Sequence, residues 1–248
     1  CGSVPLTGRK QVLLVSDQEV LSSSLTQYSD YMKSAKKSSS KDGAAMVTRV
    51  GKKIAAATEQ YLRNNGLESE IKNFAWEFNL VNDPQVNAFC MPGGKIVVYE
   101  GLMQLVSSDD ELAVVVGHEV AHAVAKHSNE RMSQQLMAQY GAQILGQALS
   151  NKSAAVQKIG ASVYGLGAQY GVMLPFSRKH ESEADYMGLV FMAMAGYNPA
   201  VAVNFWQKMS AGKSGSTPEF MSTHPSDATR INEIKQHLPE IEKYRVKK

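Results

Sequence analysis

The sequence predicts a mainly α-helical α+β fold, and three observations predict it. Segments near residues 16–37, 44–64, 108–131 and 175–196 carry apolar residues at helical spacing. Residues 73–99 change instead to the alternating pattern that is typical of β-strands. The chain has 248 residues, 44% of them hydrophobic, which is enough to bury a sizeable core. We therefore expect a small sheet surrounded by helices.

The first forty residues are expected to form an anchor segment and a helix, ahead of a main domain at residues 41–248. Cys1, followed by Gly2, resembles the start of a bacterial lipoprotein whose signal peptide has been removed. That interpretation predicts an acylated Cys1, a lipoprotein that faces the periplasm, and an outer-membrane anchor, because Gly2 is not the Asp that favours inner-membrane retention. An arbitrary chain boundary is the alternative. Cys90 would then be a lone, buried thiol.

The charge balance gives no reason to expect a nucleic-acid partner. The chain has 26 basic and 23 acidic residues, and a formal net charge of +3. Basic residues do gather in "SAKKSSSK" and "YRVKK", where a solvated end is the simplest interpretation. Beyond an acylated Cys1, we expect no contact with a membrane.

The helices and strands before residue 100 follow from local patterns. Ser16 to Lys37 is helical and ends in "KKSSSKDG", and the helix at 44–64 buries one face and stops at "NNG". The run "FAWEFNL" alternates like a strand and turns at "NDP". Pro92 and two glycines then bend the chain between "NAFC" and the strand "KIVVYEGL". This bend predicts that "NAFC" is exposed as an edge strand beside the next helix.

The stretch "GHEVAHAVAKHSNER", residues 117–131, predicts a metal site on that helix. Ser108 and Glu111 form a capping-box signature before "LAVVV", which starts the helix. His118 and His122 lie four residues apart, so their rings can reach one ion together. Glu119 lies about 100° around the helix. Its carboxylate can therefore handle the proton of a water on the ion, which is the chemistry of H-E-x-x-H zinc sites.

The rest of that stretch is predicted to lie outside the site. On a continuous helix His127 is about 140° from the ligand face, which favours a solvent-facing or supporting role. Glu130 and Arg131 are expected on an outer face. A catalytic zinc ion needs a third protein ligand and an open position, so the third ligand must come from elsewhere in the chain.

The helix between Pro175 and Gly196 offers the third ligand. Glu181, Asp185 and Gly188 fall on one stripe, and Gly188 would let the two helices approach closely. We expect Glu181 to bind zinc and Asp185 to hold a ligand histidine by its other ring nitrogen, whereas Glu183 points elsewhere. A solvated acidic face is the alternative.

The interval between the two helices is uncharged from Ile159 to Ser177 and carries four glycines. Its polar residues make it a poor membrane span. A mobile lid and close packing through small residues remain equal alternatives.

The motifs "HEVAH" and "ESEAD", in that order, resemble the zinc metallopeptidase family that includes HtpX, the CAAX prenyl protease and the periplasmic BepA and LoiP proteins. "NAFCMPGGKIVVYEGL" and "STHPSDATRI" also match and extend the resemblance over most of residues 45–240. The resemblance implies a zincin (gluzincin) fold, one zinc ion on His118, His122 and Glu181, and Asp185 beside them. The soluble BepA and LoiP branch is the expected placement.

The resemblance also implies roles for residues outside the two helices. Asn87, Ala88 and Phe89 would lie near the scissile bond of an extended polypeptide substrate. His224 would either complete a latent four-ligand shell or assist the transition state. Arg230 would stabilise the oxyanion.

We therefore expect a zinc-dependent endopeptidase that cleaves unfolded or misassembled proteins of the cell envelope. Its catalytic residues would be Glu119, Arg230 and His224. The rival hypothesis is a chaperone-like envelope assembly factor with a latent zinc site, and a purely structural zinc site is weaker because no cysteines lie nearby.

Overall fold

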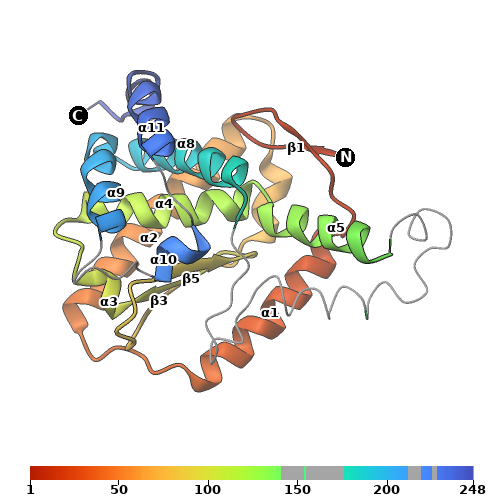
Figure 1. The fold of residues 1–248 in the computed structure, drawn as a ribbon, viewed down its shortest axis with the longest axis horizontal. Helices are drawn as coiled ribbons and strands as arrows, with labels where there is room; N and C mark the ends of the chain where they lie inside the picture. Colours follow the sequence, from red (N-terminus) through yellow and green to blue (C-terminus); the bar gives the residue numbers. More distant parts are fainter. Residues whose placement is uncertain (141–153, 155–175, 212–218, 225–227, 248) are drawn as a thin grey trace.

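The computed structural model describes residues 1–140, 154, 176–211, 219–224 and 228–247, and its mainly helical chain around a small sheet confirms the predicted fold class (Figure 1). The helices of this part are α1 (Asp17–Ser34), α2 (Lys41–Asn64), α3 (Glu100–Met103), α4 (Asp109–Val124), α5 (His127–Tyr140), α8 (Arg178–Met194), α9 (Ala202–Ala211), α10 (Glu219–Thr223) and α11 (Ala228–Ile241). Short 3₁₀ turns cover Glu68–Asn73, Pro199–Val201 and Glu242–Tyr244. The strands are β1 (Gly2–Ser3), β2 (Lys10–Gln11), β3 (Glu77–Val81), β4 (Ala88–Met91) and β5 (Lys95–Tyr99).

The three-stranded sheet has the order β3-β5-β4, with β3 parallel and β4 antiparallel to β5. The strand β4 therefore lies at an edge, as the bend after it predicts. Gly93 and Gly94 make that bend at φ 96° and 84°, which is a backbone conformation that glycine adopts without steric cost. β3 begins later than the alternating pattern suggests: Phe74 and Trp76 precede it and stack on each other at 4.7 Å.

The side chains of the sheet alternate between two buried layers. Val97 and Tyr99 pack with Tyr28 and Tyr31 of α1 on one face. On the other face, Ile96, Val98 and Ala88 belong to the larger core that includes α2, α4 and α8. In Figure 1 the sheet accordingly lies between α1 and α4, and α8 covers the far side of α4.

The helices α4 and α8 cross in close contact through two glycines. A Cβ atom on Gly188 would lie 2.7 Å from the backbone nitrogen of His118, and one on Gly117 would lie 2.6 Å from the carbonyl oxygen of Gly188. This contact confirms the predicted role of Gly188. Ser108 starts α4 as expected by accepting a hydrogen bond from the Glu111 amide, whereas the Glu111 carboxylate binds Ser107.

The prediction of one continuous helix through residues 117–131 is wrong. α4 ends at Val124, and Lys126 has a φ of 56°, which breaks the helical path before α5 begins at His127. The Lys126 ammonium lies 3.0 Å from Asp17 and 3.1 Å from Glu70. Because the chain changes direction here, the angular position expected for His127 does not apply.

The first forty residues pack on the rest of the molecule. Tyr31 of α1 meets Phe89 of β4 edge-on at 5.3 Å, and Ser38 donates its amide hydrogen to Leu80. Cys1 is exposed, and Cys90 is partly exposed with a free thiol.

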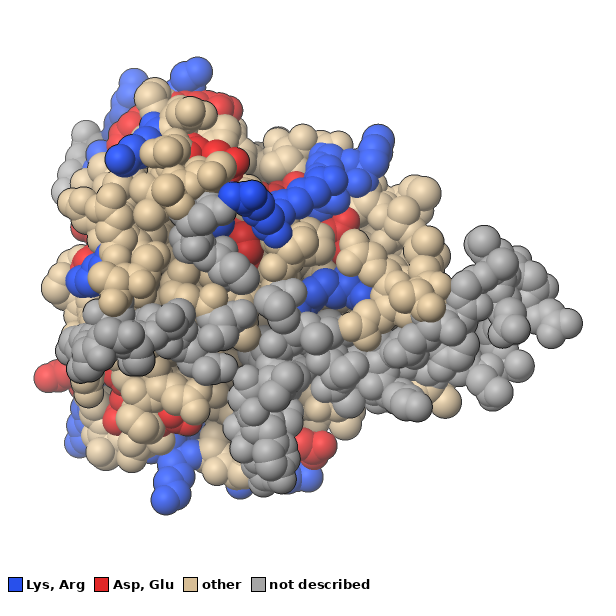
Figure 2. Space-filling view, in the orientation of Figure 1, with Lys and Arg blue, Asp and Glu red and all other residues tan. Residues whose placement is uncertain are grey.

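Figure 2 shows positive and negative side chains at several separate places on the visible face, with uncharged surface between them. Among the described helices, none combines the length and apolar character that a membrane crossing requires. The uncharged interval at 159–177, for which a lid and close packing are the alternatives, lies outside the described residues except for Phe176 and Ser177.

Candidate metal centre and active site

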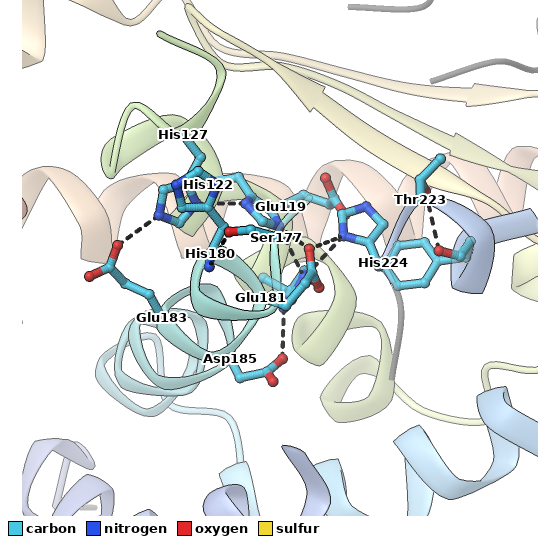
Figure 3. Close-up of polar contacts among 12 residues, drawn as sticks. Glu119, His122, His127, Ser177, His180, Glu181, Glu183, Asp185, Thr223 and His224 are labelled. Carbon is cyan, nitrogen blue, oxygen red and sulfur yellow. Dashed lines mark hydrogen bonds and ion pairs between the residues drawn. The ribbon is translucent and has the colours of Figure 1, made fainter. Parts of the chain in front are cut away.

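Four buried side chains converge on one point: His118, His122, Glu181 and His224. One nitrogen or oxygen atom from each lies within 4.8 Å of all the others. Nε2 of His118 is 3.1 Å from Nε2 of His122, and each of these atoms is 3.0 Å from a Glu181 oxygen. His224 Nδ1 is 2.8 Å from Glu181 Oε1 and 3.3 Å from His118 Nε2. Figure 3 shows His122, Glu181 and His224 around this point.

Local structure explains how these residues meet. The i, i+4 spacing on α4 brings His118 and His122 onto one face, and the glycine contact presses α8 with Glu181 against them. His224 comes from the end of α10, whose Phe220 amide donates a hydrogen bond to the Val86 carbonyl just before β4. The ring of His224 then stacks on Phe220 at 4.3 Å.

The donor set fits a zinc ion. Three imidazoles and one carboxylate are the nitrogen and oxygen ligands that zinc accepts, and tetrahedral ligand atoms about 2.0–2.1 Å from zinc lie about 3.3 Å apart. The observed separations of 2.8–3.3 Å are close to this value. Oε2 of Glu181 is fully buried and makes no hydrogen bond, as expected for an atom that is directed at a cation. These four residues could therefore hold a zinc ion.

The charges in the site favour metal ligation. Burial lowers the pKa of His122 well below its usual range, so its ring is neutral and can bind a cation. Burial alone would raise the pKa of Glu181, but the neighbouring His224, His118 and His122 outweigh this effect and hold it well below its usual value. Burial opposes protonation of His224, yet the carboxylates of Glu119 and Glu181 raise its pKa to about 10 in the metal-free protein.

Asp185 and Arg230 lie behind His118. Nδ1 of His118 is 3.0 Å from Asp185 Oδ1, although the pair is not aligned as a hydrogen bond. Arg230 donates two hydrogen bonds to Asp185, at 2.8 and 2.7 Å, and its Nη2 is 3.2 Å from Glu181. Arg230 as a whole is 2% exposed. The structure thus brings Arg230 to the site, in contact with the carboxylates of α8.

Glu119 lies next to the four-residue group but outside it. Its Oε1 is 3.0 Å from Nε2 of His224, so the His224 ring bridges Glu119 and Glu181. The Glu119 side chain is buried and its Oε1 has no aligned hydrogen bond in the described part of the chain. This is a position from which a carboxylate can exchange a proton with a small molecule in the site.

The predicted substrate residues lie in the edge strand β4 or directly before it. The carbonyl of Asn87 accepts a hydrogen bond from Tyr99 of β5, so the backbone groups of Ala88 and Cys90 point to the free edge. The Asn87 side chain accepts the Ala88 amide hydrogen at 2.9 Å. The Phe89 side chain points away from the metal group and packs against Tyr31 and Tyr99. Burial, with a contribution from the charge of Glu119, raises the pKa of the Cys90 thiol well above its usual value.

The prediction of an outer face for Glu130 and Arg131, and of a solvent position for His127, is wrong. His127 is completely buried, and Glu130 and Arg131 are 5% and 7% exposed. The break at Lys126 turns α5 toward α8, which places His127 against His122 and Glu183. Figure 3 shows His127 between these two residues. The supporting role that was the other alternative for His127 therefore matches its position.

Sequence reasoning missed the roles of three residues near the site: Arg9, Glu183 and His180. His180 contacts Glu130, and Arg9 contacts both Glu130 and Glu183. Arg9 is 109 positions before the first metal ligand in a segment without a motif, so only the folded chain shows the contact. His180 next to Glu181 was the one available hint, because a histidine one residue from a ligand is placed near the site by the same helix turn.

Comparisons with known proteins agree with a peptidase site. The mitochondrial metalloendopeptidase OMA1 of Schizosaccharomyces pombe is 36% identical over 205 residues, which cover 79% of this chain and 53% of that protein. The OMA1 protein of Arabidopsis thaliana is 40% identical over 168 residues, which cover 68% and 33%. The beta-barrel assembly-enhancing protease of Yersinia pestis is 33% identical over 174 residues, which cover 65% and 36%. The chain spans about half the length, or less, of these relatives.

These similarities correct two predictions. The expected placement next to the periplasmic BepA and LoiP lipoproteins is not supported, because OMA1 proteins match more of the chain than the assembly-enhancing protease does. The predicted localisation, a lipoprotein at the outer membrane that faces the periplasm, is wrong on this comparison, because the OMA1 relatives are named as mitochondrial. A Cys followed by small residues is too short a pattern to outweigh similarity over some 200 positions.

The family assignment rests on a match to the family as a whole. The sequence profile of peptidase family M48 matches residues 48–238, a range that includes both zinc helices, the edge strand and His224. The motifs "HEVAH" and "ESEAD" lie inside it. The chain belongs to peptidase family M48.

Proposed function

We propose that this chain is a zinc-dependent endopeptidase that hydrolyses peptide bonds in unfolded or misassembled polypeptides. The observation that carries the proposal is the convergence of His118, His122 and Glu181 with Glu119 directly beside them. The similarity to metalloendopeptidases and a protease supports it.

The residues of the site divide the chemistry among them. His118, His122 and Glu181 would hold zinc, whose Lewis acidity polarises a peptide carbonyl and makes a water nucleophilic near neutral pH. Glu119 would take a proton from the attacking water and deliver it to the leaving amine. Glu119 and the ligands are buried, and charge interactions gain strength in such a site.

The positively charged groups nearby have separate tasks. The Arg230 guanidinium already has three carboxylate contacts, at 2.7, 2.8 and 3.2 Å, so it stabilises the anionic Asp185 and Glu181 in place. His224 lies between Glu119 and the metal ligands, where a protonated ring would stabilise negative charge that develops on the substrate oxygen. We therefore assign stabilisation of the oxyanion to His224. Arg230 instead holds the carboxylates of Asp185 and Glu181 in place behind the metal ligands.

The edge strand β4 explains why the substrate would be an extended segment. The backbone of Ala88 and Cys90 faces the free edge, on which a peptide can add as a further strand. The Asn87 side chain now accepts the Ala88 amide hydrogen, so it holds the place of a substrate carbonyl. Unpaired extended segments are most abundant in unfolded or misassembled proteins, which favours such substrates.

The experiment compares the zinc-loaded parent with Glu119→Gln on an unfolded, reduced protein substrate. We expect the variant to keep zinc and to lose cleavage by about 100- to 10,000-fold, the usual contribution of a general base. Metal content is measured on the same sample. Undiminished cleavage by a pure, zinc-loaded variant would refute the mechanism.

A second candidate is a latent, chaperone-like assembly factor that keeps its zinc site closed. The specific observation is that His224 Nδ1 belongs to the four-atom ligand group while its Nε2 contacts Glu119, so one ring engages both the fourth ligand position and the base. His224→Ala separates the two candidates. Faster cleavage by the variant indicates a latent peptidase, slower cleavage indicates a transition-state role, and no cleavage by either protein favours the binding function.

A further inference from the structure

A chain of hydrogen bonds leaves the metal group through the second nitrogen of His122. Its Nδ1 lies 2.8 Å from Nδ1 of His127, and His127 Nε2 lies 2.8 Å from Oε1 of Glu183. His127 is completely buried and Glu183 is 7% exposed. These hydrogen bonds run from α4 through the start of α5 to α8, and they are separate from the Asp185 contact behind His118.

The direction of these hydrogen bonds follows from the metal site. If His122 offers Nε2 to zinc, its proton is on Nδ1 and is donated to His127. His127 then accepts at Nδ1 and donates from Nε2 to the Glu183 carboxylate. One tautomer of each ring satisfies every bond.

The carboxylate at the end of the chain is held by Arg9 from the amino-terminal segment. The Arg9 guanidinium donates to Glu183 Oε2 at 3.0 Å and Oε1 at 2.8 Å, and to both oxygens of Glu130 at 2.9 and 2.8 Å. Thr7 adds a hydrogen bond to Glu183 at 2.8 Å. These contacts hold the Glu183 carboxylate in place at the end of the hydrogen-bond chain.

A second metal ion is the alternative explanation of this cluster, because His127, Glu130 and His180 could also hold a cation. Two contacts argue against it. Arg9 already occupies both oxygens of Glu130, and both nitrogens of His127 are engaged with His122 and Glu183. The guanidinium of Arg9 is therefore the cation of this cluster.

We propose that His127, Glu183 and Arg9 are positioning residues that orient His122 toward zinc, so that the segment around Arg9 completes the metal centre. The proposal rests on the zinc site of the proposed function and extends it. Arg9 lies before residues 48–238, the part of the chain that matches the family. The arrangement parallels the other ligand: His118 is backed by Asp185 and Arg230, and His122 by His127, Glu183 and Arg9.

The test measures zinc affinity on the full chain by competition with a chromophoric chelator. The variants are His127→Asn, Glu183→Gln and Arg9→Gln, and Arg49→Gln is the matched control because Arg49 makes a similar two-bond pair with Asp109 on the surface. We expect His127→Asn and Glu183→Gln to weaken zinc binding about 10- to 100-fold. Arg9→Gln should do so by about tenfold, whereas Arg49→Gln should equal the parent.

Two further measurements separate positioning from a general loss of structure. The absorption spectrum of the cobalt-substituted protein should change in the three variants, since it reports the ligand geometry, and it should stay unchanged in Arg49→Gln. The double variant Arg9→Gln/Glu183→Gln should lose no more zinc affinity than Glu183→Gln alone, because both residues act through one path. If Arg9→Gln fails to fold, Thr7→Val takes its place, because it preserves the shape of the side chain. Thr7→Val should also weaken zinc binding, but to a smaller extent.

The outcomes distinguish this inference from the proposed function. A parent that binds one zinc tightly, with variants of equal affinity and unchanged cobalt spectra, overturns the positioning role and leaves the peptidase proposal intact. Two zinc ions per chain would overturn the assignment of Arg9 as the cation of the cluster. A parent that binds no zinc at all would overturn both proposals.

Discussion

Gly117 and Gly188 place the backbones of α4 and α8 in direct contact, one residue before His118, the first of the proposed zinc ligands. A Cβ atom on Gly188 would lie 2.7 Å from the His118 amide nitrogen and 2.9 Å from the Gly117 carbonyl oxygen. The spacing between the two zinc helices is therefore set by the absence of a side chain. His118 and Glu181 can meet at 3.0 Å because of it.

We expect Gly188→Ala to destabilise the protein by about 3 kcal/mol, because the added methyl group meets backbone atoms that cannot move aside cheaply. The sign is informative, since Gly→Ala within a helix ordinarily stabilises by about 0.5–1 kcal/mol. Urea unfolding and zinc affinity are measured together, and zinc binding should also weaken. Lys179→Ala, at an exposed position of the same helix, is the control and should stay within about 0.5 kcal/mol. A stabilised Gly188→Ala protein would contradict the close contact.

Arg230→Met should cost about 3–5 kcal/mol, because it leaves the buried carboxylates of Asp185 and Glu181 without their cation. Adding Asp185→Leu should recover part of the stability, since one unpaired buried charge is then removed. The free energy of unfolding of the zinc-loaded proteins provides the measurement. Arg49→Met breaks a comparable pair with Asp109 at the surface, where solvent screens the charges, and should cost far less. Equal losses from the two Arg substitutions would argue against the buried role of Arg230.

Acid should destabilise the protein through Glu130. Burial opposes its ionisation, but hydrogen bonds from His180 and Arg9 lower the pKa of Glu130 to about 2. Because the folded pKa lies below the unfolded value of about 4.3, the stabilisation is fully present above about pH 5. It is lost as the pH falls toward 2.

We expect Glu130→Gln to flatten the fall in unfolding free energy between pH 5 and 2, by about 2 kcal/mol once the partial exposure of Arg9 is taken into account. Denaturant titrations at a series of pH values measure it. Glu68→Gln, at an exposed position of the turn before β3, is the control. It should leave the fall in unfolding free energy between pH 5 and 2 unchanged. If the unfolding free energy of Glu130→Gln falls with pH in parallel to that of the parent, this carboxylate is not the group that titrates.

Removal of zinc with a chelator should lower the melting temperature. Zinc at a thousand times its dissociation constant stabilises the folded state by about 4 kcal/mol, which for a chain of this size corresponds to about 10 °C. Calorimetry of metal-free and reloaded protein measures the shift. Glu181→Gln should abolish most of it, since a neutral amide is a poor zinc ligand. A melting temperature that does not respond to chelation would count against tight binding at the four-residue site.

Part of the fold follows from local chemistry and could be predicted. The capping residue Ser108, the i, i+4 histidines and the glycine bend at 93–94 each act within a few residues, and the structure has them as expected. The break at Lys126 could not be predicted. It has neither Gly nor Pro to mark it, and a lysine at a φ of 56° is held there by tertiary contacts with Asp17 and Glu70.

The sequence by itself determined the zinc chemistry. Two histidines four residues apart lie on one helix face with the glutamate beside them wherever the helix lies, and Glu181 and Asp185 share one face of a second helix. Only the tertiary structure decided what supports the ligands. The turn at Lys126 buries His127 against His122, and Arg9 reaches the carboxylates of Glu130 and Glu183 across more than a hundred residues of chain. Buried charges need partners, and no local pattern specifies which distant segment provides them.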